Sequence, residues 1–455
     1  MNRRSFLSLP LASCLLRAQP ARPNIVILLA DDLGWADVGF HGGEIQTPNL
    51  NRLAIESLEI NRFYSCPVCS PTRSSLMTGR SPMRTGISYT VIRPWSNYGL
   101  PLEERTMPQA FQEAGYETAM AGKWHLGHAD ARFLPGARGF QHSYGHLNGA
   151  IDYYTHEREG GLDWHRNGKS LKEEGYSTEL IGNEAVARIR GRDRSRPLLL
   201  YVPFNSPHTP LQAPQFLIDK YGKLPNNRRR TFAAMVDSMD TQIGKILSAL
   251  EEERIAANTI VMFFSDNGGP TGQGALNTPL RGGKGSTWDG GMRVPTLLRY
   301  PGKLKAGAKS AQVATAQDVF PTLAAAAGVK PGNRLAFDGR NLWPQLTSGS
   351  SLEREDLFFT VENQASIFFA VYCGPWKLVR ELSSSGGKED NHLFRIADDP
   401  NEGDNLAHAH PGVVRDLVQR IEQWRRLYPA NGVRFSQARP DGWKAPAQWV
   451  EAASR

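Results

Sequence analysis

The sequence predicts an α/β fold, with a large, mostly parallel sheet sandwiched by helices and a small C-terminal antiparallel sheet with one helix. Two observations predict it. Up to about residue 345, short apolar runs alternate with segments of helical character, which is typical of a parallel sheet with helices on both faces. Beyond that point, short strand-like segments are separated by turn residues and closed by one amphipathic segment, which indicates a separate α+β unit.

The strand predictions depend on runs of β-branched, leucine and aromatic residues. Continuous runs in the first part favour strands buried on both faces, whereas the runs in the second part are shorter. The predicted strands are residues 24–30, 117–121, 197–204 and 259–264 in the first part, and residues 357–361, 367–372, 376–380 and 392–396 in the second.

Three helices are predicted from caps and periodicity. Residues 106–114 form a helix with Thr106 as N-cap and Gly115 as the stop. Residues 229–253 form a long amphipathic helix, because apolar residues recur every three or four positions. Residues 413–427 form the closing amphipathic helix of the second part.

Composition and length limit the class of protein. With 455 residues, 40% hydrophobic and 22% charged, the chain has ordinary globular usage, which excludes a disordered, collagen-like or coiled-coil protein. Four cysteines exclude a disulfide scaffold. We therefore divide the chain into a leader at 1–23, a large α/β domain at 24–345, and a C-terminal α+β subdomain at 346–455, whose tail from residue 429 wraps back over the surface.

The net charge of +8 would attract polyanions, but the sequence has no zinc-finger, helix-turn-helix or RNA-binding signature, so no nucleic-acid partner is predicted. The basic run at residues 228–230 is expected to be a solvated helix start.

The leader predicts export. Arg3 and Arg4 precede a short apolar stretch at residues 6–16, which resembles a twin-arginine signal, so we expect a periplasmic or secreted protein. Residues 11–14 also resemble a bacterial lipobox, which would make Cys14 a lipid-anchored first residue. Cleavage further on, near Ala18, is the alternative.

Polar residues follow four predicted strands, at the edge where ligands bind in such sheets. Lys123 and His125 follow one strand and His208 follows another. The remaining residues, Asp31, Asp32, Asp266 and Asn267, are hard oxygen ligands that would repel one another unless a cation lay among them. They predict a Ca²⁺ or Mg²⁺ site rather than a zinc site.

Cys66 and Cys69 form a C-x-x-C pair, for which zinc binding, redox activity and a disulfide are the open alternatives. Ser70 is expected to be an N-cap, with Pro71 at the first helical position and Gly79 as the stop. Cys69 then lies at a helix N-terminus, where the backbone favours an anion.

The run from Cys69 to Arg80 resembles the sulfatase signature, Cys-x-Pro-x-Arg followed by Leu-x-Thr-Gly-Arg. Further segments resemble later motifs of that family, and the resemblance covers nearly all of residues 24–428: 122–127, 282–284 with 288–291, where Asp289 stands in place of a common Glu, and 393–406. Within the family, other stretches are similar to the arylsulfatase B, or N-acetylgalactosamine-4-sulfatase, type: 84–86, 101–104, 138–140, 152–157, 266–269 and 279–282.

The resemblance implies an enzyme that hydrolyses sulfate monoesters, on a sulfated amino sugar or glycosaminoglycan-type glycan. It implies that a formylglycine-generating enzyme oxidises Cys69 to Cα-formylglycine, and that Cys69 joins the four oxygen ligands around Ca²⁺, with Mg²⁺ less favoured. It assigns Asp266 to activate the nucleophile, and Lys123 to the sulfate oxygens. It places Lys284 and His208 on the leaving-group side, His125 at sulfate release, and Arg73 on the formylglycine oxygens.

Two other functions remain open. One is a hydrolase of phosphonate monoesters or phosphodiesters in the same superfamily, and the other is a catalytically silent Ca²⁺-dependent glycan-binding protein. Loops at 87–98 and 148–164 are expected to shape the pocket, with Asp152, His156 and Trp164 as candidate sugar contacts.

Overall fold

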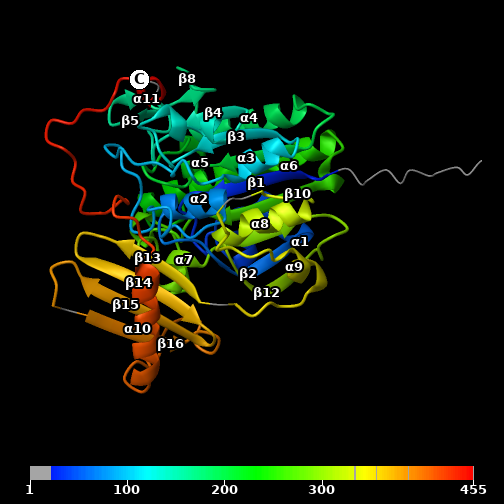
Figure 1. Ribbon diagram of the computed structural model, residues 1–455. Helices are drawn as coiled ribbons and strands as arrows, with labels where there is room; N and C mark the ends of the chain where they lie inside the picture. Colours follow the sequence, from blue (N-terminus) through cyan, green and yellow to red (C-terminus); the bar gives the residue numbers. More distant parts are fainter. Residues whose placement is uncertain (1–21, 333–334, 355, 388, 454–455) are drawn as a thin grey trace, which may run out of the picture.

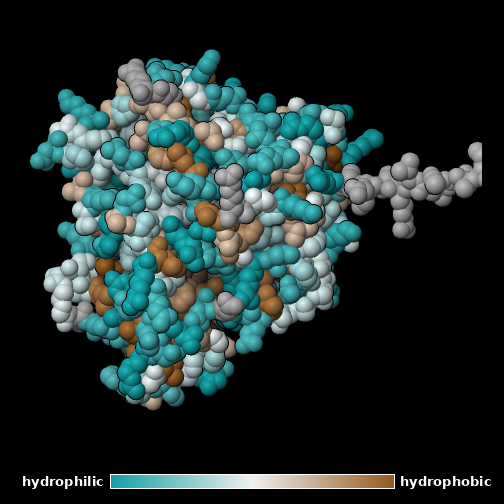
Figure 2. Space-filling view, viewed as in Figure 1, coloured by the Kyte–Doolittle hydropathy of each residue, from teal (hydrophilic) through white to brown (hydrophobic). Residues whose placement is uncertain are grey.

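The computed structural model describes residues 22–332, 335–354, 356–387 and 389–453, and it confirms the predicted fold class (Figure 1). The predicted signal motif, the lipid-anchor residue Cys14 and the cleavage site near Ala18 lie outside the described residues. Among those residues, no helix is both long and apolar enough to cross a bilayer. The face in Figure 2 is largely hydrophilic, with scattered apolar patches.

The described residues form a large ten-stranded sheet with β1 near its middle. β1 pairs in parallel with its two neighbours, β10 and β9, and β3 and β4 continue the parallel part. The strands in spatial order are β12 (Ala308–Thr315), β2 (Leu58–Tyr64), β11 (Thr296–Arg299), β10 (Thr259–Ser265), β1 (Asn24–Ala30), β9 (Leu198–Pro203), β3 (Glu117–Lys123), β4 (His142–His146), β7 (His165–Arg166) and β8 (Lys169–Ser170).

Helices cover both faces of this sheet. Alternate residues of β1 point to opposite faces, and because all of them are apolar from Ile25 on, both faces need covering. Ile25, Ile27 and Leu29 face α2 (Cys69–Thr78), α3 (Met107–Glu113), α8 (Ala316–Ala326) and α9 (Trp343–Ser348). Val26, Leu28 and Ala30 face α1 (Pro48–Glu56), α4 (Ser177–Arg190), α5 (Gln215–Lys220) and α6 (Asn227–Glu252). Short 3-10 helices lie in the connections: η1 (Gly39–His41), η2 (Ala131–Phe133), η3 (Pro135–Arg138), η4 (Ala256–Asn258) and η5 (Thr271–Gln273).

The small sheet is antiparallel and packs between α10 and the large sheet. Its order is β13 (Leu357–Glu362), β14 (Ser366–Cys373), β15 (Trp376–Ser383) and β16 (Glu389–Arg395). Phe369 and Val371 of β14 face α10 (Pro411–Arg425), whereas Ala370 and Tyr372 face Tyr64 of the large sheet. The period of two along β14 therefore gives this subdomain two apolar faces.

Buried charges fasten the small sheet to the large one. Lys377 on β15 lies with its Nζ atom 2.8 Å from Asp289 Oδ1 and 2.5 Å from Glu402 Oε1. Asp289 opens α7 (Asp289–Met292), and its backbone N–H donates to Glu402 at 2.8 Å. Tyr372 also donates to Asp289. The small sheet thus holds the segment that follows Lys284.

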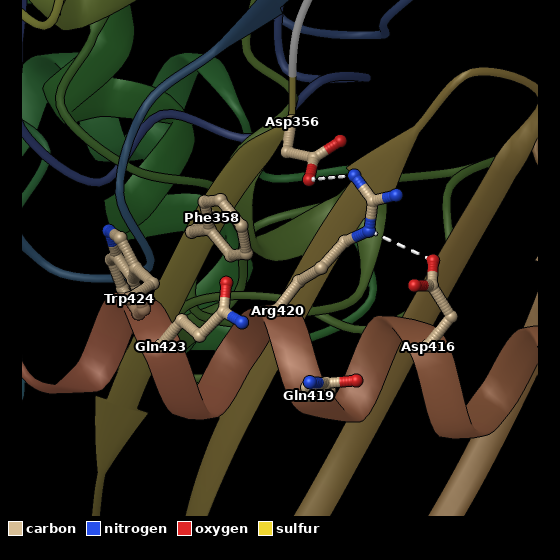
Figure 3. A pocket seen from close by; sticks show the side chains of 7 residues that line it. All are labelled: Asp356, Phe358, Asp416, Gln419, Arg420, Gln423 and Trp424. Carbon is tan, nitrogen blue, oxygen red and sulfur yellow. Dashed lines mark hydrogen bonds and ion pairs between the residues drawn. The ribbon is translucent and has the colours of Figure 1, made fainter.

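On the other face of the small sheet, α10 crosses β13 and leaves a groove of about 650 Å³ (Figure 3). Figure 3 shows Arg420 between Asp356 and Asp416, with hydrogen bonds of 2.8 and 2.9 Å. None of the predicted site residues lines this groove.

The tail returns to the large sheet, as predicted (red in Figure 1). The Val433 N–H donates to the Gly86 carbonyl, and Gln448 bridges to Leu162 in the short ribbon of β5 (Glu157–Arg158) and β6 (Gly161–Leu162). The final helix α11 (Trp449–Ala453) packs beside β8.

Two local predictions are wrong. The helix α2 starts at Cys69 rather than after a Ser70 cap, because the Ser70 hydroxyl instead accepts from the Ile92 N–H and donates to the His125 carbonyl. Arg229 in the basic run is buried rather than solvated, because it pairs with Asp37 at 2.6 Å and Glu44 at 3.0 Å.

Candidate active site

The polar residues after four strands converge at one edge of the large sheet. β1 leads into Asp31 and Asp32, β3 ends at Lys123, β9 is followed by His208, and β10 leads into Asp266. These strands run parallel and are neighbours through β9, so their carboxyl ends open on the same side. The convergence expected from the sequence is thus present.

Cys69 completes this edge from the first turn of α2. Its Sγ atom lies 3.5 Å from Asp31 Oδ1 and 3.6 Å from Lys284 Nζ, and only 1% of the residue is exposed. Burial and the neighbouring Asp266 raise the pKa of its thiol. Cys66 and Cys69 are both free thiols, so the disulfide alternative is not what the structure contains.

Three buried carboxylates face three cationic side chains. Lys123 Nζ lies 2.6 Å from Asp31 Oδ2, and Lys284 Nζ lies 2.6 Å from Asp32 Oδ1. Both the Nε and Nη2 atoms of Arg73 donate to Asp266 Oδ2, at 3.0 and 2.8 Å. The charges at the centre of the site are therefore balanced.

The carboxyl groups of Asp266 and Asp32 have different pKa values because their surroundings differ. Burial and the nearby Asp31 raise the pKa of Asp266 to about 6. Burial alone would also raise the pKa of Asp32, but the adjacent Lys284 ammonium holds it below its ordinary value. Asp266 therefore accepts a proton more readily than Asp32 does.

The two histidines are neutral, and His125 keeps a free ring nitrogen. His125 Nε2 lies 2.9 Å from the Ile92 carbonyl, which places the proton on Nε2 and leaves the buried Nδ1 without a partner. Burial and Lys123 hold the pKa of His125 well below its ordinary value. His208 donates through Nδ1 to the Thr209 carbonyl at 2.6 Å, and burial with Lys284 lowers its pKa to about 3.

The donor set fits a hard divalent cation. The buried Oδ1 atom of Asn267 has no hydrogen-bond partner, while its Nδ2 atom donates to Asp32 at 2.8 Å. Ligand atoms of Asp31, Asp32, Cys69 and His208 lie within 4.8 Å of one another. His208 was predicted as a proton donor only, because its approach to Asp32, at 3.7 Å, arises from tertiary structure.

A cleft of about 680 Å³ opens onto this centre and is lined by Cys69, His125, His208 and Lys284. The predicted loops at 87–98 and 148–164 both contribute to its lining, through residues 90–95, 149–150 and 158.

The three candidate sugar contacts do not line the cleft. Trp164 is only 1% exposed and stacks on the buried His156, with ring centroids 4.5 Å apart. Asp152 instead holds its own turn, by accepting from the N–H groups of Tyr154 and Thr155. Arg93 and Arg158, which the sequence analysis did not single out, do line it.

Comparisons with known proteins match residues 23–426 of the chain to sulfatase family models. Residues 23–329 match the sulfatase family, and residues 284–426 match the C-terminal part of N-sulphoglucosamine sulphohydrolase. The chain is 32% identical to mouse arylsulfatase J, over 90% of this chain and 77% of that one. It is 35% identical to human N-acetylgalactosamine-6-sulfatase, over 75% of this chain and 69% of that one.

Solved structures show the same fold. Ps i-CgsB in complex with k-i-k-neocarrahexaose is 32% identical with a TM-score of 0.83, covering 91% of this chain and 94% of that one. The PsFucS1 sulfatase from Pseudoalteromonas sp. is 25% identical with a TM-score of 0.73, covering 90% and 91%.

Proposed function

Because the chain belongs to the sulfatase family, whose members are sulfuric ester hydrolases, we propose that it is an exported enzyme that hydrolyses sulfate monoesters on sugars or glycosaminoglycan-type glycans. The observation that supports this most directly is the position of Cys69, between the carboxylate of Asp31 and the ammonium of Lys284 at the floor of a cleft.

Cys69 needs chemical conversion before it can act. A buried thiol with a raised pKa is a poor nucleophile, because the thiolate is the reactive form. Oxidation to Cα-formylglycine by a formylglycine-generating enzyme, followed by addition of water to the aldehyde, would supply two hydroxyl groups at this position instead. Asp266, whose carboxylate lies close enough to residue 69 to raise the pKa of its thiol, then takes the proton from the attacking hydroxyl.

The residues that would hold Ca²⁺ are Asp31, Asp32, Asp266, Asn267 and the modified residue 69. The ion would draw negative charge from the sulfate oxygens, and the all-oxygen donor set favours Ca²⁺ or Mg²⁺ over zinc. A bound cation would also release Lys123 and Lys284 from their carboxylates, so that both ammonium groups can contact sulfate.

The remaining side chains move protons. Lys284, whose ammonium carries a proton and lines the cleft beside Cys69, protonates the oxygen of the leaving sugar. His208 lines the same side and is the alternative donor only once its Nε2 is protonated, because the proton it holds lies on Nδ1. The free Nδ1 of His125 accepts the proton of the second hydroxyl of residue 69, as sulfate leaves and the aldehyde forms again. Arg73 keeps Asp266 oriented through two hydrogen bonds.

The names of the relatives suggest the first substrates to try. Human and mouse relatives are named N-acetylgalactosamine-6-sulfatase, and a structural neighbour was solved with k-i-k-neocarrahexaose. We therefore propose a sulfated galactosamine or galactose unit, and the resemblance to the arylsulfatase B type adds the 4-sulfate to the panel.

The experiment that tests the proposal is the mass of the tryptic peptide 63–73, from protein produced together with a formylglycine-generating enzyme. Alkylation should label Cys66, whereas position 69 should react with a hydrazide as an aldehyde. The same protein should hydrolyse sulfated galactosamines in CaCl₂, and Cys69→Ala should not. A retained thiol at position 69 without turnover would favour a glycan-binding protein, and faster turnover of phosphonate esters would favour the phosphonate hydrolase.

A further inference from the structure

Two arginines line the cleft without taking part in the proposed chemistry. Arg93 follows the loop residue Ile92, and Arg158 ends β5. The role inferred for these two residues rests on the proposed function and concerns which glycans bind in the cleft.

Arg93 stands on a fixed piece of backbone. The preceding Ile92 donates its N–H to Ser70 and accepts at its carbonyl from His125, at 3.1 and 2.9 Å. The following Pro94 accepts from His128 at 3.0 Å. The backbone on both sides of Arg93 is therefore held in place.

The guanidinium of Arg93 packs against aromatic rings, and in the described residues no carboxylate forms an ion pair with it at contact distance. It lies over Phe435, at 4.4 Å from the ring centroid, and near Trp95 at 5.5 Å. Within the described part of the chain it makes no hydrogen bond or ion pair, and its Nε atom is buried without a partner. Burial lowers the pKa of Arg93, and the charge of Glu362 offsets this effect only in part.

Glu362, the acidic group whose charge acts on Arg93, is already paired with Arg434. Glu362 also lines the cleft, but both of its oxygens accept from Arg434, at 2.8 and 2.9 Å, and one accepts from the Phe435 N–H. Its negative charge is thus compensated by Arg434, which leaves Arg93 available to an incoming anion.

Arg158 has a similar character. Its carbonyl is fixed by the Trp449 indole N–H at 3.1 Å, and its Nε atom is buried without a partner. Its contact with Glu159 is long, at 3.4 Å, and that carboxylate lies on an exposed residue. Guanidinium groups pair with sulfate and carboxylate in fork geometry, so both arginines offer sites for oxyanions.

We propose that Arg93 and Arg158 form a second anion subsite, which binds another sulfate or carboxylate group of the same glycan while the scissile sulfate lies at Cys69. The enzyme would then select polyanionic oligosaccharides over sugars that carry a single sulfate.

The test measures binding in the Cys69→Ala protein, which holds ligand without turnover, by calorimetry in CaCl₂. The probes are one sulfated N-acetylgalactosamine disaccharide in three forms: with a neutral neighbouring sugar, with a second sulfate there, and with a uronate carboxylate there. A second anion should tighten binding by roughly 10- to 100-fold. The sulfate and carboxylate arms show which anion is preferred.

Arg93→Gln and Arg158→Gln should each remove most of that gain, and Arg93→Lys should keep part of it. Arg420→Gln is the matched control, because Asp356 and Asp416 already pair this arginine in another pocket (Figure 3). It should keep the full gain.

An equal affinity for the three probes, or a gain that survives in both glutamine variants, would overturn the subsite. Turnover by the unaltered protein is measured separately. If the gain is present and depends on both arginines but no sulfate ester is hydrolysed, the anion subsite stands and the proposed hydrolase function fails.

Discussion

Arg73 is fully buried, and its guanidinium makes hydrogen bonds only inside the site. Two of its nitrogens contact Asp266 and a third donates to the Lys123 carbonyl at 2.7 Å. The side chain therefore links the end of β3 to the end of β10. Its predicted contact with oxygens at position 69 stays a prediction, because the described contacts all go to these two partners and to Asp31 at 3.9 Å.

We expect Arg73→Met to destabilise the fold strongly. The substitution leaves the Asp266 carboxylate buried without its hydrogen-bond donors, which costs roughly 3–5 kcal/mol. Arg73→Lys should lose less, because the charge remains although the fork geometry is lost. Urea unfolding of both variants measures the difference, and equal free energies of unfolding would contradict the assigned pairing.

Asn267 provides a second test at the scale of one residue. If its free Oδ1 atom is a Ca²⁺ ligand, CaCl₂ at 100 times its dissociation constant should stabilise the unaltered protein by about 2.7 kcal/mol, and EGTA should remove that gain. Asn267→Ala should shrink the gain, whereas Asn183→Ala on the exposed side of α4 should not. Thermal unfolding midpoints in EGTA, CaCl₂ and MgCl₂ measure it, and a full gain in Asn267→Ala would exclude this ligand.

At the scale of elements, the sequence predicted those whose signal is local. Residues 24–30 were predicted as a strand and form β1 with the same bounds. The six apolar residues that follow Asn24 without interruption need burial on both faces of the sheet. The helix at 106–114 is confirmed as α3 with a Thr106–Gln109 capping box. Gly79 ends α2 at φ 67°, the left-handed conformation that glycine favours.

The missed elements have weak local signals. The first half of β12 alternates exposed and half-buried residues at the edge of the large sheet, so its sequence carries no apolar run. β2 lies inside the sheet, but the half-buried Asn61 and Arg62 in its middle interrupt its apolar residues. The unpaired state of Arg93 could not be predicted either, because it depends on Arg434 neutralising Glu362 from a distant segment.

The junction between the sheets depends on Lys377, which is fully buried between Asp289 and Glu402. Lys377→Met should cost roughly 3–5 kcal/mol, because two buried carboxylates lose their cation. It should also lower kcat, since α7 follows the segment that carries Lys284. Adding Glu402→Gln should restore part of the stability.

Denaturant unfolding and steady-state kinetics test this junction. Lys309→Met is the matched control, because that side chain is 63% exposed and pairs with Glu59 at the sheet edge. A Lys377→Met protein with unchanged stability would contradict the role of the buried charges.

At the scale of the whole molecule, acid should loosen the attachment of the tail. His128 is buried and packs edge-on against Trp449 of α11, with ring centroids 5.1 Å apart, and burial lowers its pKa to about 4. The unfolded chain binds its proton near pH 6.5. Between these values the unfolded state holds more protons, so the free energy of unfolding falls as the pH falls.

The expected loss from His128 is about 3 kcal/mol between pH 6.5 and pH 4. His128→Gln keeps a donor for the Pro94 carbonyl but cannot titrate, so its stability should fall less over this interval. Urea unfolding at a series of pH values measures both slopes, and identical slopes would show that His128 does not contribute.

The return of the tail has a consequence for the order in which the protein is made. Synthesis starts at the N-terminus, so Cys69 and the strands around it leave the ribosome well before Phe435 and Trp449. The former supports Arg93 and the latter fixes the backbone of Arg158. The part of the cleft that would choose among glycans is therefore completed last, and a chain that stops short of residue 435 would keep the centre at Cys69 while lacking that wall.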